Sequence, residues 1–282
     1  MSHHLEAARV TLGYDRMVVA EDLSVAVPPE QVTCIVGANA CGKSTLLRAL
    51  ARLLRPLAGD VLLDGRAIHK LPTREVATTL GILPQSPIAP DGITVADLVS
   101  RGRYPHQRWL QQWGRVDEDA VTRAMALTGT LELATRCVDE LSGGQRQRAW
   151  IAMTLAQGTP LMLLDEPTTF LDLAHQVDVL DLLVDLNQRE GRTIVLVLHD
   201  LNQAARYSHH LIAMKRGAIV ASGHPAEVIT EDLVREVFDL PCRIIDDPVA
   251  GTPMVVPIGR HLDVSAEDVS TPSIGGRDAA FV

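Results

Sequence analysis

Aromatic residues are scarce in this 282-residue chain, which holds three tryptophans, three tyrosines and three phenylalanines. No apolar run approaches the ~18–20 residues that span a bilayer, so no transmembrane helix is predicted. The first residues, Met1 to Glu6, have neither the basic start nor the apolar centre of a signal peptide. The net charge of −9 argues against general nucleic-acid binding.

Cysteine and histidine are also used sparingly. The four cysteines (Cys34, Cys41, Cys137 and Cys242) show no paired spacing, which is typical of a reduced cytosolic protein rather than a disulfide framework. The histidine pairs at 3–4 and 209–210 lack metal-ligand spacing to other ligands. We therefore expect no metal site built from protein ligands alone.

One glycine-rich segment has a specific pattern. It fits G-x-x-x-x-G-K-[ST], in which backbone N–H groups surround phosphates, and it comprises Gly37, Ala38, Asn39, Ala40, Cys41, Gly42, Lys43, Ser44 and Thr45. Val32 to Val36 predicts a buried strand before it. An apolar stripe predicts a helix after it, with Leu46, Leu47, Leu50, Leu53 and Leu54 on one face. In this context Lys43 would neutralise the β- and γ-phosphates and Ser44 would ligate Mg²⁺.

Two residues of this loop leave alternatives open. If position 40 needs a left-handed backbone, alanine there costs roughly 1–2 kcal/mol; we expect instead that Ala40 has a negative φ. Cys41 lies at a helix N-terminus near Lys43, where thiol pKa values tend to fall. A small inert side chain is the alternative that we favour for Cys41.

Two further segments carry polar groups at the ends of regular structure. Leu161 to Leu164 is an apolar run that leads directly into Asp165 and Glu166, as expected where a buried strand delivers acids to a site. About twenty residues earlier stand Ser142, Gly143, Gly144 and Gln145, at the start of a probable helix. Backbone N–H groups at a helix N-terminus form an anion site.

Taken in chain order, the segments at 37–45, 142–145 and 161–166 resemble the Walker A, signature and Walker B motifs of ATP-binding-cassette (ABC) ATPases. The resemblance implies ATP and Mg²⁺ as ligands. Asp165 would hold Mg²⁺, through water, and Glu166 would polarise the attacking water as general base. Leu171-Asp172 matches the D-loop, which in this family crosses between two ATPase subunits.

Three more positions match contacts of the family. The apolar run Ile194 to Leu198 predicts a strand covered on both faces that delivers His199 to its end. His199 matches the switch histidine, which would contact the γ-phosphate and hold Glu166 and the water in line. Gln85 resembles the Q-loop glutamine, which reaches Mg²⁺ and the water. Tyr14 resembles the A-loop aromatic that stacks on adenine.

The fold implied is α/β: a P-loop NTPase (RecA-like) core with an N-terminal antiparallel β subdomain and an inserted α-helical subdomain. We expect the ATPase domain at 5–260, with core and β subdomain at 5–93 and 158–240 and the helical subdomain at 94–157. The last residues, 265–282, are polar and glycine-containing, which predicts a disordered tail.

A single module without a fused membrane domain or long heptad insertion resembles the separate ATPase subunit of an importer. Residues 165–172 and 199–207 look like ferric-siderophore importers, as does the segment from Asp247 to Pro253. Cobalamin and haem importers are alternatives. A soluble ABC ATPase without a membrane partner is the rival class.

The expected partners follow from this resemblance. Walker A already surrounds the triphosphate within the chain, so the signature residues would bind the γ-phosphate held by a second copy. Integral-membrane permease subunits would dock beside Gln85, with a substrate-binding protein as an indirect partner, at the cytoplasmic face of the membrane. Arg101 to Trp113, which includes Trp109, is the candidate contact; its alternative is a mobile loop whose rings pack locally.

Overall fold

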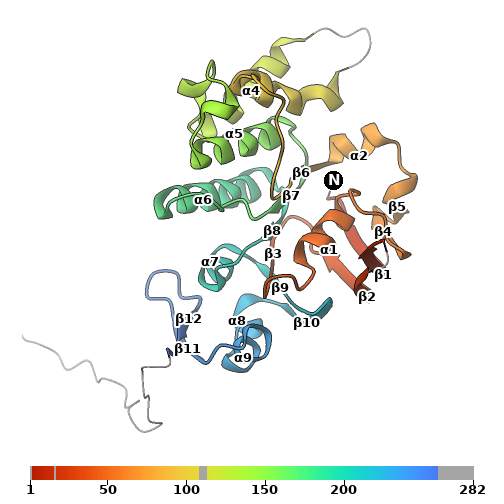
Figure 1. The fold of residues 1–282 in the computed structure, drawn as a ribbon, viewed down its shortest axis with the longest axis vertical. Coiled ribbons are helices and arrows are strands. Elements are labelled where there is room, and N and C mark those ends of the chain that lie inside the picture. Colours follow the sequence, from red (N-terminus) through yellow and green to blue (C-terminus); the bar gives the residue numbers. More distant parts are fainter. Residues whose placement is uncertain (1, 16, 108–112, 260–282) are drawn as a thin grey trace, which may run out of the picture.

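The computed structural model describes residues 2–15, 17–107 and 113–259 (Figure 1). The expected tail at 265–282 and Trp109 lie outside these residues. Within them, no helix has the length and apolar character needed to cross a membrane.

The centre of the molecule is a six-stranded sheet in the order β10-β9-β3-β8-β7-β6. All neighbouring pairs are parallel except the hairpin of β9 and β10. Its strands are β3 (Val32–Gly37), β6 (Leu80–Leu83), β7 (Leu161–Asp165), β8 (Thr193–Val197), β9 (His210–Lys215) and β10 (Ala218–Gly223). Every residue of β3, β7 and β8 is buried, which explains why their sequences are mostly apolar.

Alternate residues of these strands face two different apolar clusters. On β8, Ile194 and Leu196 belong to one cluster, while Val195 and Val197 belong to the other. The same division holds along β3 and β7, because successive side chains of a strand point to opposite faces. The sheet is therefore covered on both sides, and its carboxyl edge is left to carry polar residues.

One of these clusters joins the central sheet to a second, antiparallel sheet. Its order is β2-β1-β4-β5, with strands β1 (Leu5–Tyr14), β2 (Met17–Val27), β4 (Ala58–Leu63) and β5 (Arg66–Ala67). Helix α1 (Lys43–Leu50) contributes Leu46 and Leu47 to the same cluster. The predicted stripe on this helix was too long: Arg52 has φ +64, the helix ends at Leu50, and Leu53 is 59% exposed.

The other helices lie around the core. They are α2 (Thr73–Thr79), α3 (Val95–Ser100), α4 (Arg115–Leu127), α5 (Gly143–Ala156), α6 (Leu173–Glu190), α7 (Leu201–Tyr207), α8 (Pro225–Val228) and α9 (Glu231–Phe238). Helix α5 packs on both α3 and α4. Its buried Ile151 and Leu155 share a cluster with Leu164 of β7, so the helical group and the sheet have one continuous core.

The described chain ends in a small hairpin, β11 (Cys242–Asp246) and β12 (Pro253–Pro257), with Cys242 opposite Pro257. Figure 1 shows it at the end of the molecule away from α4 and α5. Its strands contact α7 and α9. The architecture is the P-loop NTPase core with an antiparallel β subdomain and a helical insertion that the sequence predicts.

Candidate functional site

The glycine-rich loop connects β3 to α1, and two of its glycines have a positive φ that other residues rarely adopt. Gly37 has φ +153, and a Cβ there would lie 2.3 Å from the carbonyl oxygen of Met214. Gly42 has φ +108 and precedes the first residue of α1, where no side chain caps the helix. Lys43, 5% exposed, donates from Nζ to the carbonyl oxygens of Gly37 (2.8 Å) and Ala38 (3.0 Å). The loop therefore combines a helix N-terminus with a lysine ammonium, as an anion site requires.

The expectation for Ala40 was wrong. Ala40 has φ +60, in the left-handed region, so it carries a cost of roughly 1–2 kcal/mol that glycine would avoid. Its neighbour Cys41 is only 5% exposed, and its Sγ lies 2.7 Å from where a Cβ of Gly37 would stand. Such burial favours the inert small side chain over a reactive thiol.

The end of β7 brings a carboxylate to the first turn of α1. Ser44 donates from Oγ to Oδ1 of Asp165 at 2.9 Å. The other carboxylate oxygen, Oδ2, is buried and has no hydrogen-bond partner among the residues that the structure describes. Burial raises the pKa of Asp165, opposed by the bond from Ser44 and reinforced by the charge of Glu166. A hydroxyl beside an unpartnered carboxylate oxygen suits a hard divalent cation such as Mg²⁺.

The next residue, Glu166, faces His199. Nε2 of His199 lies 2.7 Å from Oε1 of Glu166, and the hydroxyl of Thr169 donates to Oε2 at 3.3 Å. Glu166 has φ +54, a strained conformation for a non-glycine residue that costs of order 1–3 kcal/mol. Its side chain is 10% exposed, whereas that of His199 is 47% exposed. The strained turn thus leaves Glu166 sheltered and His199 accessible.

Lys43, Ser44, Glu166 and His199 line one cavity of about 820 Å³, and Asp165 lies behind Ser44 without lining it. The cavity is lined by Tyr14, Met17, Val19, Asn39, Ala40, Cys41, Gly42, Lys43, Ser44, Thr45, Gln85, Glu166 and His199. Tyr14, 38% exposed, accepts a hydrogen bond from Nη1 of Arg48 at 3.4 Å. The sequence interpretation missed Met17 and Val19, because apolar residues of an edge strand carry no motif; their nearness to Tyr14 was the only signal.

The signature residues lie elsewhere. Ser142 caps α5 by accepting from the N–H of Gln145 at 3.3 Å, and Oε1 of Gln145 accepts from the N–H of Ser142 at 3.2 Å. Gly143 faces Phe170, and Gly144 faces Leu171, the first residue of the D-loop. None of the residues from 142 to 145 lines the cavity.

Comparison with known proteins agrees with this arrangement. Residues 20–169 match the family described as "ABC transporter". The chain is 58% identical to the probable siderophore transport system ATP-binding protein YusV of Bacillus subtilis, over 89% of this chain and 91% of the relative. It is 56% identical to the ferric enterobactin transport ATP-binding protein FepC of Escherichia coli, over 91% and 94%.

Solved structures show the same fold. A metal-chelate type ABC transporter in an inward-facing conformation has a TM-score of 0.77 and 28% identity, covering 92% of this chain and 98% of that one. The dimeric cassette MJ0796 has a TM-score of 0.71 and 25% identity, covering 78% and 98%. With a phosphate loop, Glu166 and His199 around one cavity and Asp165 bonded to Ser44 of that loop, this chain belongs to the ABC transporter family as one of its ATP-binding, ATP-hydrolysing chains.

Proposed function

We propose that this chain powers the uptake of an iron–siderophore complex through a separate membrane permease. The observation that carries the proposal is that sequence identity is higher to relatives named for siderophore transport than to a relative named for cobalamin import. Three relatives named for siderophore, enterobactin or petrobactin transport are 53–58% identical over 89–95% of this chain, and a second petrobactin relative is 44% identical over 78%. A relative named for cobalamin import, from Halobacterium salinarum, is 38% identical over 93%.

The cavity supports the proposed contacts with ATP. Tyr14 would stack on the adenine, with Met17 and Val19 as apolar neighbours. Backbone N–H groups of the loop 37–45 and the ammonium of Lys43 would bind the β- and γ-phosphates. Because Lys43 is buried among carbonyl oxygens, its charge is directed toward the loop rather than toward bulk water.

Ser44 and Asp165 would hold Mg²⁺, together with Gln85, which lines the same cavity as Ser44. The unpartnered Oδ2 of Asp165 supports this assignment. When bound, Mg²⁺ neutralises charge that develops on the phosphate oxygens.

Glu166 would accept a proton from the attacking water as general base. His199 would keep the Glu166 carboxylate oriented, since the two side chains are already paired, and would donate to the γ-phosphate from its exposed position. Thr169 holds the second carboxylate oxygen, which limits rotation of the base.

A second copy of the chain would complete the site. The N-terminus of α5 offers the N–H groups of Gly143 and Gly144 with Ser142, yet these residues do not line the chain's own cavity. The γ-phosphate bound by another copy is the ligand that suits them.

The permease would dock in a groove of about 610 Å³ beside the segment that follows Gln85. The groove is lined by Pro90, Asp91, Gly92, Ile93, Asp97, Ser100, Arg101, Tyr104, Gln107 and Trp113. Tyr104 is 60% exposed and Trp113 44%. Arg103 of the same run is buried instead, paired with Asp117 at 2.9 Å, so it holds α4 rather than a partner. The chain would thus sit at the cytoplasmic face of the membrane and meet a substrate-binding protein only indirectly.

The domain division at 5–93, 94–157 and 158–240 is part of this proposal. Helices α3, α4 and α5 fall within the middle range, which would move as a unit against the core when ATP binds.

Deletion of the gene tests the function. Uptake of radioactive iron supplied as enterobactin, petrobactin or hydroxamate complexes should fall and return with the wild-type gene but not with Glu166→Gln. Loss of cobalamin or haem uptake alone would assign the chain to those substrates. Unchanged uptake of all of them, with no permease co-purifying, would favour the soluble class.

A further inference from the structure

A chain of hydrogen bonds links the D-loop to helix α7. Nε2 of Gln176, on the first turn of α6, donates to the backbone carbonyl oxygen of Leu171 at 3.0 Å. Oε1 of the same side chain accepts from Nε2 of Gln203, on α7, at 2.7 Å. The three residues come from separate elements, so the amide of Gln176 bridges loop and helix.

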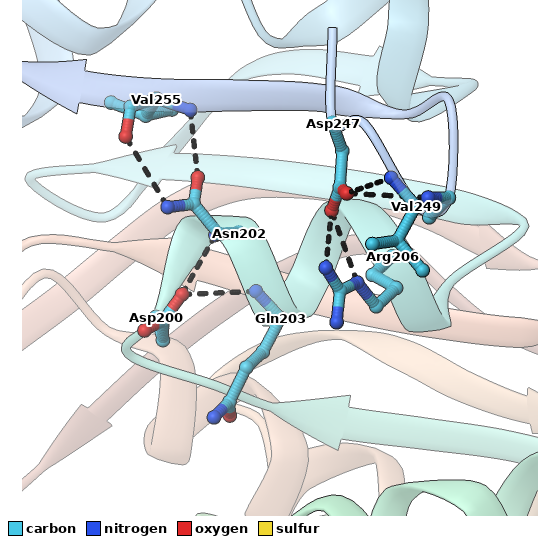
Figure 2. A network of polar contacts seen from close by, with 8 residues as sticks. Asp200, Asn202, Gln203, Arg206, Asp247, Val249 and Val255 are labelled. Carbon is cyan, nitrogen blue, oxygen red and sulfur yellow. Dashed lines mark hydrogen bonds and ion pairs between the residues drawn. The ribbon is translucent and has the colours of Figure 1, made fainter. Parts of the chain in front are cut away.

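Helix α7 begins at Leu201, two residues after His199. Asp200 caps it by accepting from the N–H groups of Asn202 at 2.8 Å and Gln203 at 2.9 Å (Figure 2). The side chain of Gln203 is therefore held in a fixed relation to His199 by one capped helical turn.

The contacts close into a ring. At one end of the loop 166–172, Glu166 pairs with His199 at 2.7 Å. At the other end, Leu171 is tied through Gln176 to Gln203. Residues 199–203 are therefore linked to both ends of the loop 166–172.

The opposite side of α7 is anchored to the C-terminal hairpin. Asn202 accepts from the N–H of Val255 at 2.7 Å and donates to its carbonyl oxygen at 3.2 Å. Arg206 pairs with Asp247, whose side chain is 4% exposed. Figure 2 shows both contacts on the same helix as Asp200 and Gln203. Because the hairpin holds α7 in place, we expect that losing the Gln203 contact shifts the loop 166–172 and His199 rather than the helix.

We propose that Gln176 and Gln203 form a positioning pair that sets the distance between the switch histidine and the D-loop within one chain. Neither residue lines the nucleotide cavity, so the pair acts through His199 and Leu171. The inference rests on the roles proposed above for Glu166 and His199. It adds to them that the D-loop and the histidine change position together.

Methionine substitutions test the pair, because methionine keeps the length of glutamine and removes both amide contacts. In the full-length chain, Gln203→Met and Gln176→Met should each lower kcat for ATP by roughly twofold to tenfold, the span of one neutral hydrogen bond. The KM for ATP should stay within about twofold, since the binding residues are untouched. The double variant should lose no more than the larger single loss, because both substitutions break one chain of contacts.

Two controls separate positioning from simple stabilisation. Gln188→Met makes the same change at an exposed position near the other end of α6 and should leave kcat unaltered. In a His199→Ala background, Gln203→Met should cause no further loss, because the group that it positions is gone. Thermal unfolding of each variant shows whether a lower kcat comes from a less stable fold.

The outcomes are distinct. Unchanged kcat in both methionine variants overturns the pair, as does an equal loss in the His199→Ala background. Full turnover by Glu166→Gln and His199→Ala would instead overturn the proposed roles of those two residues. Gln176→Glu, which keeps an acceptor for Gln203 but removes the donor to Leu171, should lose as much kcat as Gln176→Met if the link to the D-loop is what matters.

Discussion

Nε2 of His199 lies 2.7 Å from Oε1 of Glu166, although the two residues follow different strands. Strands β7 and β8 are neighbouring and parallel, so their carboxyl ends meet at one edge of the sheet. The pair therefore follows from the strand topology, which places the proposed base beside the histidine proposed to orient it.

Glu166→Gln removes the base while keeping the size of the side chain. Turnover should fall by roughly 100- to 10,000-fold, the contribution typical of general-base catalysis. ATP binding should persist, and the variant should accumulate as an ATP-bound dimer on gel filtration. Hydrolysis at the wild-type rate would remove Glu166 from the base role.

Ala40→Gly relieves a left-handed backbone at φ +60. Relief of the strained backbone contributes roughly 1–2 kcal/mol, and the freer unfolded chain takes back ~0.4–1 kcal/mol, so the unfolding free energy should rise by up to about 1.6 kcal/mol. Denaturant unfolding measures it. The matched control is Gly42→Ala at φ +108, which should lower stability. A loss on Ala40→Gly would mean that the alanine methyl makes compensating contacts.

Complementation between two defective subunits tests whether a second copy of the chain completes the ATP site. Ser142→Ala and Lys43→Ala chains should each be nearly inactive alone. In a mixed dimer, the intact phosphate loop of one chain faces the intact signature of the other, which restores one of two sites. Activity on mixing should rise with the fraction of mixed dimer. A mixture that stays as inactive as its parts would argue for a site within one chain.

Tyr104→Ala should weaken docking in the groove beside Gln85, because a ring that is 60% exposed is removed from the proposed contact. Membrane co-sedimentation with the permease and iron uptake should both fall. Tyr104→Phe retains the ring and serves as the matched control. Equal co-sedimentation of the two variants would place the contact elsewhere.

Acid should loosen the hairpin from α7. The hydrogen bond from Arg206, followed by those from the N–H groups of Val249 and Ala250, holds the pKa of Asp247 below its usual range. Because the pKa of Asp247 is lower in the folded state, its charge stabilises the fold at pH values above the unfolded-state pKa of about 3.9. This stabilisation is lost as the pH falls through the folded-state pKa.

Asp247→Asn should therefore lower the melting temperature at pH 7, and its difference from wild type should shrink as pH falls below about 4. The exposed Asp246→Asn removes a charge without touching the Arg206 contact and controls for net charge. A difference that is constant with pH would show that the Asp247 charge is not responsible.

The sequence by itself determined the fold class and most of the residues that line the cavity of about 820 Å³. This was possible because the strands β3, β7 and β8 are buried on both faces and therefore have mostly apolar sequences. Each run ends in a chemically distinctive residue or loop. Parallel topology then brings such ends together whatever the intervening sequence.

Only the tertiary structure decided the backbone at Ala40, the burial of Arg103 and the end of α1. A positive φ at alanine depends on how the whole loop closes, and local preference predicted the opposite. Arg103 belongs to a basic, aromatic run, but its guanidinium pairs with Asp117 and donates to the carbonyl oxygen of Ala156 at the end of α5. The link from Leu171 through Gln176 to Gln203 had no sequence signal either, because glutamine amides have no characteristic spacing and their partners are set by how α6 and α7 pack.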